Sequence, residues 1–177
     1  MTYAGIGSRK APLAQLERMT RAAKRLASKG YTLRSGGADG ADRAFEAGAG
    51  GKKEIYLPWK GFNGSTSSFV SPSRDAMDVA AAVHPAWSRL SPAAQKLQAR
   101  NSHQILGEDL RTPCDFVICW TPDGAETEKE RTAATGGTGQ AIALASRWGV
   151  PVFNFARPDA GERLHAFVQD LRGPAAA

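Results

Sequence analysis

The chain has few cysteines and lacks the spacing of a metal site. Only Cys114 and Cys119 are present among 177 residues, five apart in one expected strand. Side chains alternate along a strand, so we expect the two thiols to point to opposite faces and to stay unpaired. They do not form a Cys-x-x-Cys pair, and the three histidines are scattered. We therefore expect no metal and a reducing, cytoplasmic setting.

Long apolar runs are also missing. No stretch approaches the roughly 18 apolar residues of a membrane span, and the first residues read as a strand rather than a basic-then-apolar leader. We expect no contact with a membrane. An apolar content of 42% suffices for one core without disulfides or metal. The expected organisation is one domain over residues 1–172 and a frayed tail over 173–177. No heptad repeat is legible, and the choice between monomer and homo-oligomer stays open.

Positive charge exceeds negative charge. The net charge is +6 and the isoelectric point is near 9.6, which suits a polyanionic partner without demonstrating one. A helix expected over residues 12–29 gathers basic side chains on one side: Arg18, Arg21, Lys24, Arg25 and Lys29. This stripe is either a solvated helix face or a surface for a phosphate backbone.

Short apolar runs alternate with helical patterns along the whole chain. This alternation predicts an α/β fold, a Rossmann-like domain whose mostly parallel sheet has about five or more strands and carries helices on both faces. Gly30 and Gly149 stand where helices should end. The expected strands cover 2–6, 31–34, 54–58, 115–120 and 151–155, and the expected helices cover 12–29, 38–48, 91–110, 137–148 and 159–172.

Two polar segments interrupt this alternation. Residues 59–73 are rich in Gly, Ser and Asn and predict a long surface loop, of a length that is often functional. Residues 121–137 carry many charges and are either a mobile flap or a solvated connector.

Three glycine-rich segments follow or precede the expected strands: GIGSR (5–9), SGGADGAD (35–42) and TGGTGQ (135–140). Glycine lets a backbone turn sharply and approach a phosphate, and helix N-termini there present free N–H groups. In a parallel sheet these segments would meet at the carboxyl edge, which predicts a nucleotide-phosphate site. The sequence has neither a Walker lysine nor a full GxGxxG with its downstream acid, which disfavours P-loop NTPases and NAD dehydrogenases.

Side chains in these segments add specific chemistry. Ser8 and Arg9 could clamp a phosphate between a hydroxyl and a guanidinium. Asp39 and Asp42 could cap a helix or accept a hydrogen bond from a ribose hydroxyl. Neutral donors in the third segment come from Thr138 and Gln140.

Six segments follow one another in a characteristic order: IGSRKAP (6–12), YTLRSGGADGADRAFEAGA (31–49), LPW (57–59), RNSHQILG (100–107), CDFVICW (114–120) and TGGTGQAIALASRWGVPVFNF (135–155). In this order they resemble the DprA-like DNA-processing proteins, part of the SLOG superfamily of Rossmann-like nucleotide-binding domains. The chain is most similar to compact phage and prophage members. Full-length DprA proteins carry flanking domains for which this chain is too short, so recombinase-loading functions are not implied.

The resemblance implies a site for a nucleotide or for single-stranded DNA in DNA processing, recombination or phage-host nucleotide signalling. Arg100 and Asn101 match the family's RN dipeptide, which contacts phosphate or base. The implied residues are Gly7, Ser8, Arg9, Ser35, Gly36, Gly37, Asp39, Gly40, Asp42, Arg100, Asn101, Gly136, Gly137, Thr138 and Gly139, to which the loop pattern adds Gly5 and Gln140.

The first hypothesis is a binding protein that needs no cofactor and breaks no bond. If its ligand is a nucleic acid, exposed aromatic rings could stack on bases. Trp59, Phe62, Trp87 and Trp120 are the candidates. Core packing is the alternative for all of them, and we favour it for Trp120 and Trp148.

Two alternatives remain. An N-glycosidase of the related phosphoribohydrolase type needs a glutamate where Ala143 stands, so Asp39, Asp42, Glu126 or Glu128 would have to replace it. A sensor or sequestering protein would instead close its loops over a small nucleotide-derived signal.

Overall fold

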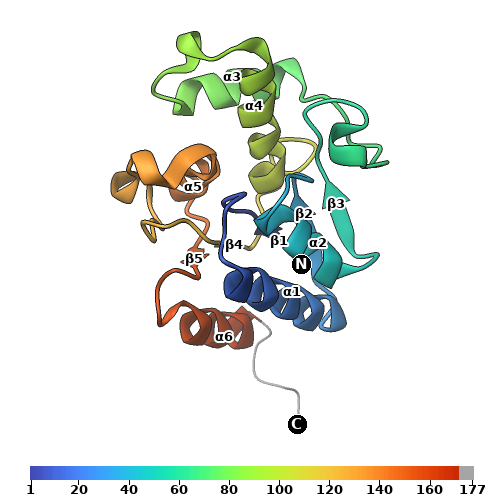
Figure 1. The fold of residues 1–177 in the computed structure, drawn as a ribbon, viewed down its shortest axis with the longest axis vertical. Helices are drawn as coiled ribbons and strands as arrows, with labels where there is room; N and C mark the ends of the chain where they lie inside the picture. Colours follow the sequence, from blue (N-terminus) through green and yellow to red (C-terminus); the bar gives the residue numbers. More distant parts are fainter. Residues whose placement is uncertain (172–177) are drawn as a thin grey trace.

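The computed structural model describes residues 1–171, and the tail expected at 173–177 lies outside them. Its centre is a five-stranded, fully parallel sheet with the strand order β3-β2-β1-β4-β5 (Figure 1). The predicted Rossmann-like α/β fold is confirmed. All five strands lie where the sequence predicted them, to within one residue at each end except that β3 ends three residues early: β1 Thr2–Gly5, β2 Thr32–Ser35, β3 Lys53–Ile55, β4 Phe116–Cys119 and β5 Val152–Asn154.

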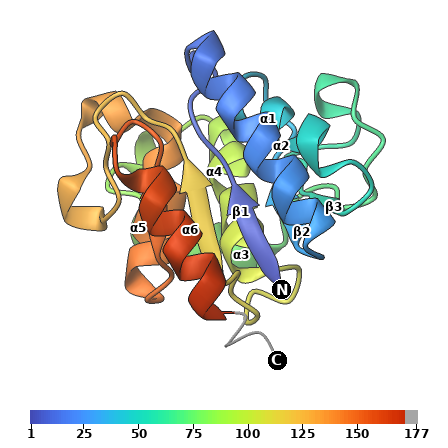
Figure 2. The ribbon, with the colours of Figure 1, turned by 90° about the horizontal axis from the view of Figure 1, so that it is seen from below.

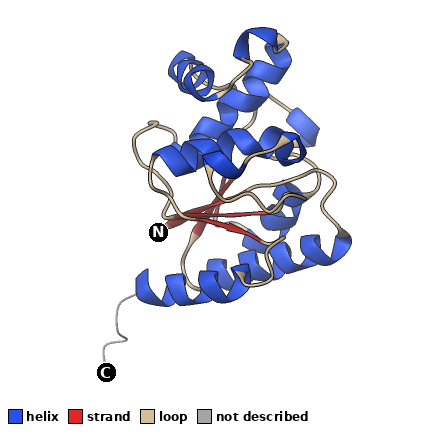
Figure 3. Cartoon of the chain, turned by 90° about the vertical axis from the view of Figure 1, so that its left-hand side faces the viewer, coloured by secondary structure: helices blue, strands red, loops and turns tan. Residues whose placement is uncertain are grey.

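Helices cover both faces of the sheet (Figures 1 and 3). One face packs against α1 (Leu13–Ser28), α2 (Ala41–Ala49) and α6 (Ala160–Leu171). The other face packs against α4 (Pro92–Leu106) and α5 (Gly139–Arg147). A further helix, α3 (Arg74–Val83), packs on α4 through small side chains. No described helix is long and apolar enough to cross a membrane.

Aromatic rings fill the core between the sheet and the face of α1 and α6. Phe116, in the interior strand β4, is fully buried, and its ring lies 5.7 Å from those of Tyr3 and Tyr31. It also contacts the rings of Phe153 and Phe167 edge to face. Every residue of β4 is buried, as expected for a parallel strand covered on both faces.

The helix α3 was not predicted from the sequence. Its buried residues are Ala76, Ala80 and Val83, which have the spacing of one helix face but little apolar bulk. Ser73 caps it by accepting from the Ala76 N–H at 3.1 Å. Residues 59–73 before it form the predicted long loop, which contains the short turn η1 (Phe62–Gly64) and an isolated β-bridge from Val70 to Leu57.

The prediction that the two cysteines face opposite sides of the sheet was wrong. Cys114 precedes β4, so the alternation of that strand does not extend to it, and both cysteines lie in the core cluster beside α4 and α5. Both are free and buried. Burial raises the pKa of the Cys114 thiol to about 12, so it is protonated near neutral pH.

Two helices end on glycine as predicted. The N–H of Gly149 donates to Ser146 O and the N–H of Val150 to Ala145 O, which is the Schellman arrangement. Gly149 has a φ of 68°, and the same pattern ends α1 at Gly30. These ends turn the chain directly into the next strand.

The contribution of the positive φ of Gly149 to the end of α5 can be tested by mutation. Gly149→Ala should lower the free energy of unfolding by about 1 to 2 kcal/mol, because a Cβ is strained at this φ although the surrounding space is empty. Gly51→Ala is the matched control, since Gly51 has empty space and no positive φ, and it should change stability little. Urea denaturation measures both, and equal effects would contradict this account of the cap.

Candidate functional site

The three glycine-rich segments meet in one pocket of about 280 Å³. It lies beyond the carboxyl ends of the neighbouring strands β1 and β4. From β1 the chain continues to β2 and β3 on one side of the sheet, whereas β4 and β5 lie on the other side. Such a switch point is the usual ligand site of open parallel sheets. The lining residues are Ile6, Gly7, Ser8, Arg9, Ala38, Asp42, Leu97, Gln98, Arg100, Asn101, Gln104, Ala134, Thr135, Gly136, Gly137, Thr138 and Ala141.

The first segment passes closely over β4. A Cβ on Gly7 would lie 2.9 Å from Trp120 O and from the Ala41 side chain, which is too close for any residue with a side chain. Only glycine therefore allows the backbone to pass at this distance. This close approach lets the Ser8 N–H donate to Trp120 O at 3.0 Å. Arg9 follows at the mouth of the pocket with an exposed side chain.

A buried ion pair joins the second segment to α4. Arg100 Nη1 lies 3.1 Å from Asp42 Oδ2, and both side chains are more than nine-tenths buried. Burial raises the pKa of Asp42, and the charge and hydrogen bond of Arg100 oppose that rise. The pair is therefore a fixed part of the pocket wall, and much of the charge of Arg100 is already compensated inside the protein.

Gly36 makes room for this pair. A Cβ on Gly36 would lie 0.9 Å from Arg100 Nη1, so any side chain there would displace the guanidinium. The Gln104 amide, oriented with its oxygen toward Arg100, accepts from the Gly36 N–H at 2.6 Å and from Arg100 Nη1 at 2.8 Å. In this orientation its nitrogen donates to Asn101 Oδ1 at 3.1 Å. The polar side chains of α4 thus hold one another in place.

The third segment is held by a carboxylate behind it. Asp123 accepts hydrogen bonds from the hydroxyls of Thr121, Thr132 and Thr135 and from the Ala125 N–H. Burial alone would raise the pKa of Asp123, but these hydrogen bonds outweigh it and lower the pKa to about 2. Gly136 then turns the chain with a φ of 60° toward the start of α5.

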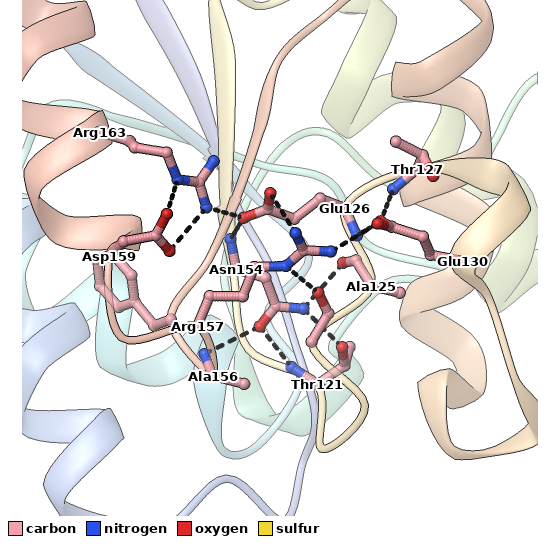
Figure 4. A network of polar contacts seen from close by, with 12 residues as sticks. Thr121, Ala125, Glu126, Thr127, Glu130, Asn154, Ala156, Arg157, Asp159 and Arg163 are labelled. Atoms are coloured by element: carbon pink, nitrogen blue, oxygen red, sulfur yellow. Dashed lines mark hydrogen bonds and ion pairs between the residues drawn. The ribbon is translucent and has the colours of Figure 1, made fainter.

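The segment expected at 121–137 as a flap or connector is tied to the body of the protein (Figure 4). Glu126 accepts from Arg163 Nη2 and from the Asn154 N–H at 2.7 and 2.8 Å. Glu130 accepts from Arg157 Nη2 at 2.7 Å. These contacts connect the segment to β5 and α6. The last residues of the segment, 134–137, line the pocket.

Nine of the predicted residues line the pocket: Gly7, Ser8, Arg9, Asp42, Arg100, Asn101, Gly136, Gly137 and Thr138. Gly5, Ser35, Gly36, Gly40 and Gly139 are not among the lining residues. Ser35, for example, is fully buried and its hydroxyl donates to Gly5 O at 2.7 Å.

Three predicted residues lie elsewhere. Gly37 lines a separate, open pocket beside β3. Asp39 is exposed and pairs with Arg43 at 2.9 Å. Gln140 is buried, and its amide donates to Ala80 O in α3, so it points away from the pocket.

Further residues of α4 contribute to the pocket and were not predicted from the sequence. Leu97, Gln98 and Gln104 line the pocket together with Arg100 and Asn101. Positions 97, 100, 101 and 104 share one helix face, so helical spacing from the RN dipeptide could have found two of them.

None of the aromatic candidates lines this pocket in the described part of the chain. Phe62 is buried in the core, so its ring is not exposed for stacking. Trp59 packs on it edge to face and is 37% exposed, whereas Trp87 packs against the α3 and α4 cluster. Trp120 packs partly buried on the core as favoured, but Trp148 is 48% exposed, which corrects the expectation of core packing.

The four candidate catalytic carboxylates are all engaged. Asp42 alone lines the pocket, paired with Arg100. Asp39 pairs with Arg43, Glu126 with Arg163, and Glu128 with Arg147 at 2.7 Å. Ala143 is fully buried in the core. In the described residues, no group of His, Cys, Asp and Glu has the arrangement of a metal site.

No protein-family model matches the chain, and no curated protein matches it. Among solved structures, the chain is similar to DNA processing protein A from Helicobacter pylori, the subject of a structural study of its single-stranded DNA binding mode. The TM-score is 0.55 at 18% identity, and the match covers 96% of this chain and 73% of the other. At this identity the likeness concerns the fold, and it confirms the DprA-like fold expected from the sequence.

The role of Gly36 in leaving room for the Arg100 guanidinium can be tested by mutation. Gly36→Ala should displace Arg100 from Asp42 and lower the free energy of unfolding by up to about 3 kcal/mol, because it leaves a carboxylate buried and poorly paired. Gly137→Ala in the same pocket has its nearest neighbour at 3.5 Å and should be tolerated. Denaturant unfolding of the two variants is the measurement, and similar losses for both would refute this role of Gly36.

The Asp123 carboxylate predicts a pH dependence. Its pKa in the folded protein lies below the ordinary 3.8, so it stabilises the fold above about pH 4 and loses this effect as the pH falls to about 2. The stability difference between the wild type and Asp123→Asn should therefore shrink by about 1 to 2 kcal/mol from pH 5 to pH 2. Unfolding measured across this range would contradict the prediction if the difference stayed constant.

Proposed function

We propose that the protein binds single-stranded DNA through its phosphates at the pocket between β1 and β4. The observation that carries this proposal is the meeting of three glycine-rich segments with Arg9 and the polar face of α4 at one carboxyl edge. The similar fold of a DNA processing protein studied for single-stranded DNA binding supports it.

The charges near the mouth favour a phosphate ligand. Asp42 is paired with Arg100 and Asp39 with Arg43, so neither carboxylate cancels the exposed charge of Arg9. Lys10 beside it is also exposed. A guanidinium binds phosphate oxygens in a planar, two-pronged manner, which suits Arg9 to this role.

The backbone of the pocket suits the same ligand. The segment over Gly136 and Gly137 leads directly into α5, whose first residue is Gly139. The N–H groups at a helix start carry positive partial charge, and glycines expose them to a ligand. Since no described aromatic ring lines the pocket, binding would depend on phosphates more than on stacked bases.

The same geometry gives no support to cleavage of the ligand. A glycosidase needs a carboxylate that is free to exchange a proton with the ligand, and Asp42 is held by Arg100. Binding of a small nucleotide is the second candidate, because the pocket volume of about 280 Å³ is small. A cytoplasmic role in DNA processing or recombination, or in phage-host signalling as the SLOG resemblance implies, belongs to the proposal.

Ligand class can be decided by thermal unfolding. Deoxythymidine oligomers of about six nucleotides should raise the melting temperature by mass action, and mononucleotides should raise it less. A rise with mononucleotides alone would favour the nucleotide sensor. Release of free base from any nucleotide in the same samples would instead reveal an enzyme.

The role of Arg9 has its own test. Arg9→Gln should weaken binding of the labelled oligomer several-fold and reduce the slope of log affinity against log salt by about 0.7, as expected for one lost phosphate contact. Lys52→Gln removes one exposed charge just before β3, at the opposite edge of the sheet, and serves as the control. Fluorescence anisotropy at several salt concentrations measures both, and equal losses would count against a specific contact by Arg9.

A further inference from the structure

A groove of about 280 Å³ separates α1 from α6 on the face of the sheet away from α4 and α5. Figure 2 shows the two helices on this side of the sheet, α1 in blue and α6 in red. Its lining shares no residue with the candidate site. The lining residues are Arg18, Arg21, Ala22, Arg25, Leu26, Lys29, Phe155, Gly161, Leu164, His165 and Val168.

The basic stripe of the sequence forms one wall of this groove. Four of its five members line it, and Lys24 does not. Arg21 and Arg25 are exposed, and no carboxylate lines the groove in the part of the chain that the structure describes. The only ion pair of Arg21 in the described chain is with Glu17 at 3.7 Å, and both side chains are more than half exposed. Such pairs contribute little, so the wall keeps its positive charge.

Arg18 packs against the protein itself, unlike the other basic residues of the groove wall. Its guanidinium lies 4.2 Å above the Phe155 ring, and Nη1 donates to Phe155 O at 3.3 Å. Gly161 accommodates it, since a Cβ there would lie 2.6 Å from Nη2. Arg18 therefore fixes one end of the groove, whereas Arg21, Arg25 and Lys29 are available to a ligand.

The floor of the groove is apolar but already covered. Leu26, Phe155, Leu164 and Val168 are each at most 8% exposed. A docking helix gains most of its affinity from apolar anchors that it newly buries, and this floor offers little such area. The described lining nevertheless carries the basic side chains of Arg21, Arg25 and Lys29 and no carboxylate, and this one-signed charge favours a polyanion over an uncharged amphipathic helix.

The groove begins at the same edge of the sheet as the pocket. Phe155 directly follows β5, so the end held by Arg18 lies at the carboxyl edge. The segment that carries Arg9 and Lys10 leads directly into α1. From Arg18 to Lys29 the helix advances about 16 Å, enough to follow several nucleotides of an extended strand.

We propose that the α1 and α6 groove binds the phosphate backbone of a single strand after it leaves the pocket. This inference rests on the proposed function, because it extends the binding of the same strand. The groove adds length and salt dependence to binding, and the pocket holds the first phosphates.

The experiment compares two oligomer lengths and two variants. The groove variant is Arg21→Gln/Arg25→Gln/Lys29→Gln. The control variant is Lys52→Gln/Arg74→Gln/Arg111→Gln, which replaces exposed residues outside the groove and changes the net charge equally, from +6 to +3. Labelled deoxythymidine oligomers of about six and about twenty nucleotides are titrated at several salt concentrations, and circular dichroism confirms that both variants are folded.

The longer oligomer should bind the groove variant at least about tenfold more weakly than the control variant, with a salt slope smaller by about two. The short oligomer should bind both variants equally. Equal affinity of both variants for the longer oligomer would overturn the groove and leave the proposed function standing. Failure of the wild type to bind either oligomer would overturn both.

A labelled polyglutamate peptide distinguishes the other class of polyanion. If it binds the wild type and loses affinity only in the groove variant, while the oligomers are insensitive to that variant, the groove serves an acidic protein and the inference is wrong. If the oligomers respond to the groove variant and the peptide does not bind, the nucleic-acid assignment is supported.

Discussion

The buried ion pair between Asp42 and Arg100 is the contact on which the candidate site depends. It joins the start of α2 to the middle of α4 across the carboxyl edge of the sheet, and the Arg100 guanidinium occupies space that a Cβ on residue 36 would fill. Removing two charges from water costs much of what their attraction returns. The pair therefore contributes less to net stability than to geometry, because it allows one arrangement of the second glycine segment against α4.

This pair also constrains what the site can do. Since Arg100 already has a carboxylate partner, attraction for an anion must come largely from Arg9, from backbone N–H groups and from the start of α5. Since Asp42 is held by Arg100, the one acid in the pocket is not free for proton transfer. A single contact thus favours binding over catalysis.

The three segments of the pocket are held by three different interactions. The first depends on the close approach of Gly7 to Trp120, the second on the ion pair, and the third on the hydroxyls gathered by Asp123. A site fixed before its ligand arrives loses less conformational freedom on binding. Flexible binding would belong instead to the α1 and α6 groove, where exposed Arg21 and Arg25 could follow a strand of variable sequence.

Much of this protein follows from its sequence alone. Alternating apolar runs determined the five parallel strands, and Gly30 and Gly149 determined two helix ends, because these signals act over a few residues. The glycine segments predicted that Arg9 and Gly136 would lie close together, because strand ends of a parallel sheet converge, and both line one pocket. Arg100, which lines the same pocket, was singled out by the resemblance to DprA-like proteins and not by a local pattern. Helix α3 was not predicted, because its buried face consists mainly of alanines, which differ little in hydrophobicity from the residues around them.

Only the tertiary structure decided how these residues are used. It paired Asp42 with Arg100, turned Gln140 toward Ala80, and bound Glu126 to Arg163, and each of these contacts joins residues at least 37 positions apart in the chain. It likewise assigned the basic stripe of α1 to a groove whose other wall is α6. Local pattern can say which groups a chain carries, but a charge becomes a ligand contact or a structural pair according to the partner that folding brings to it.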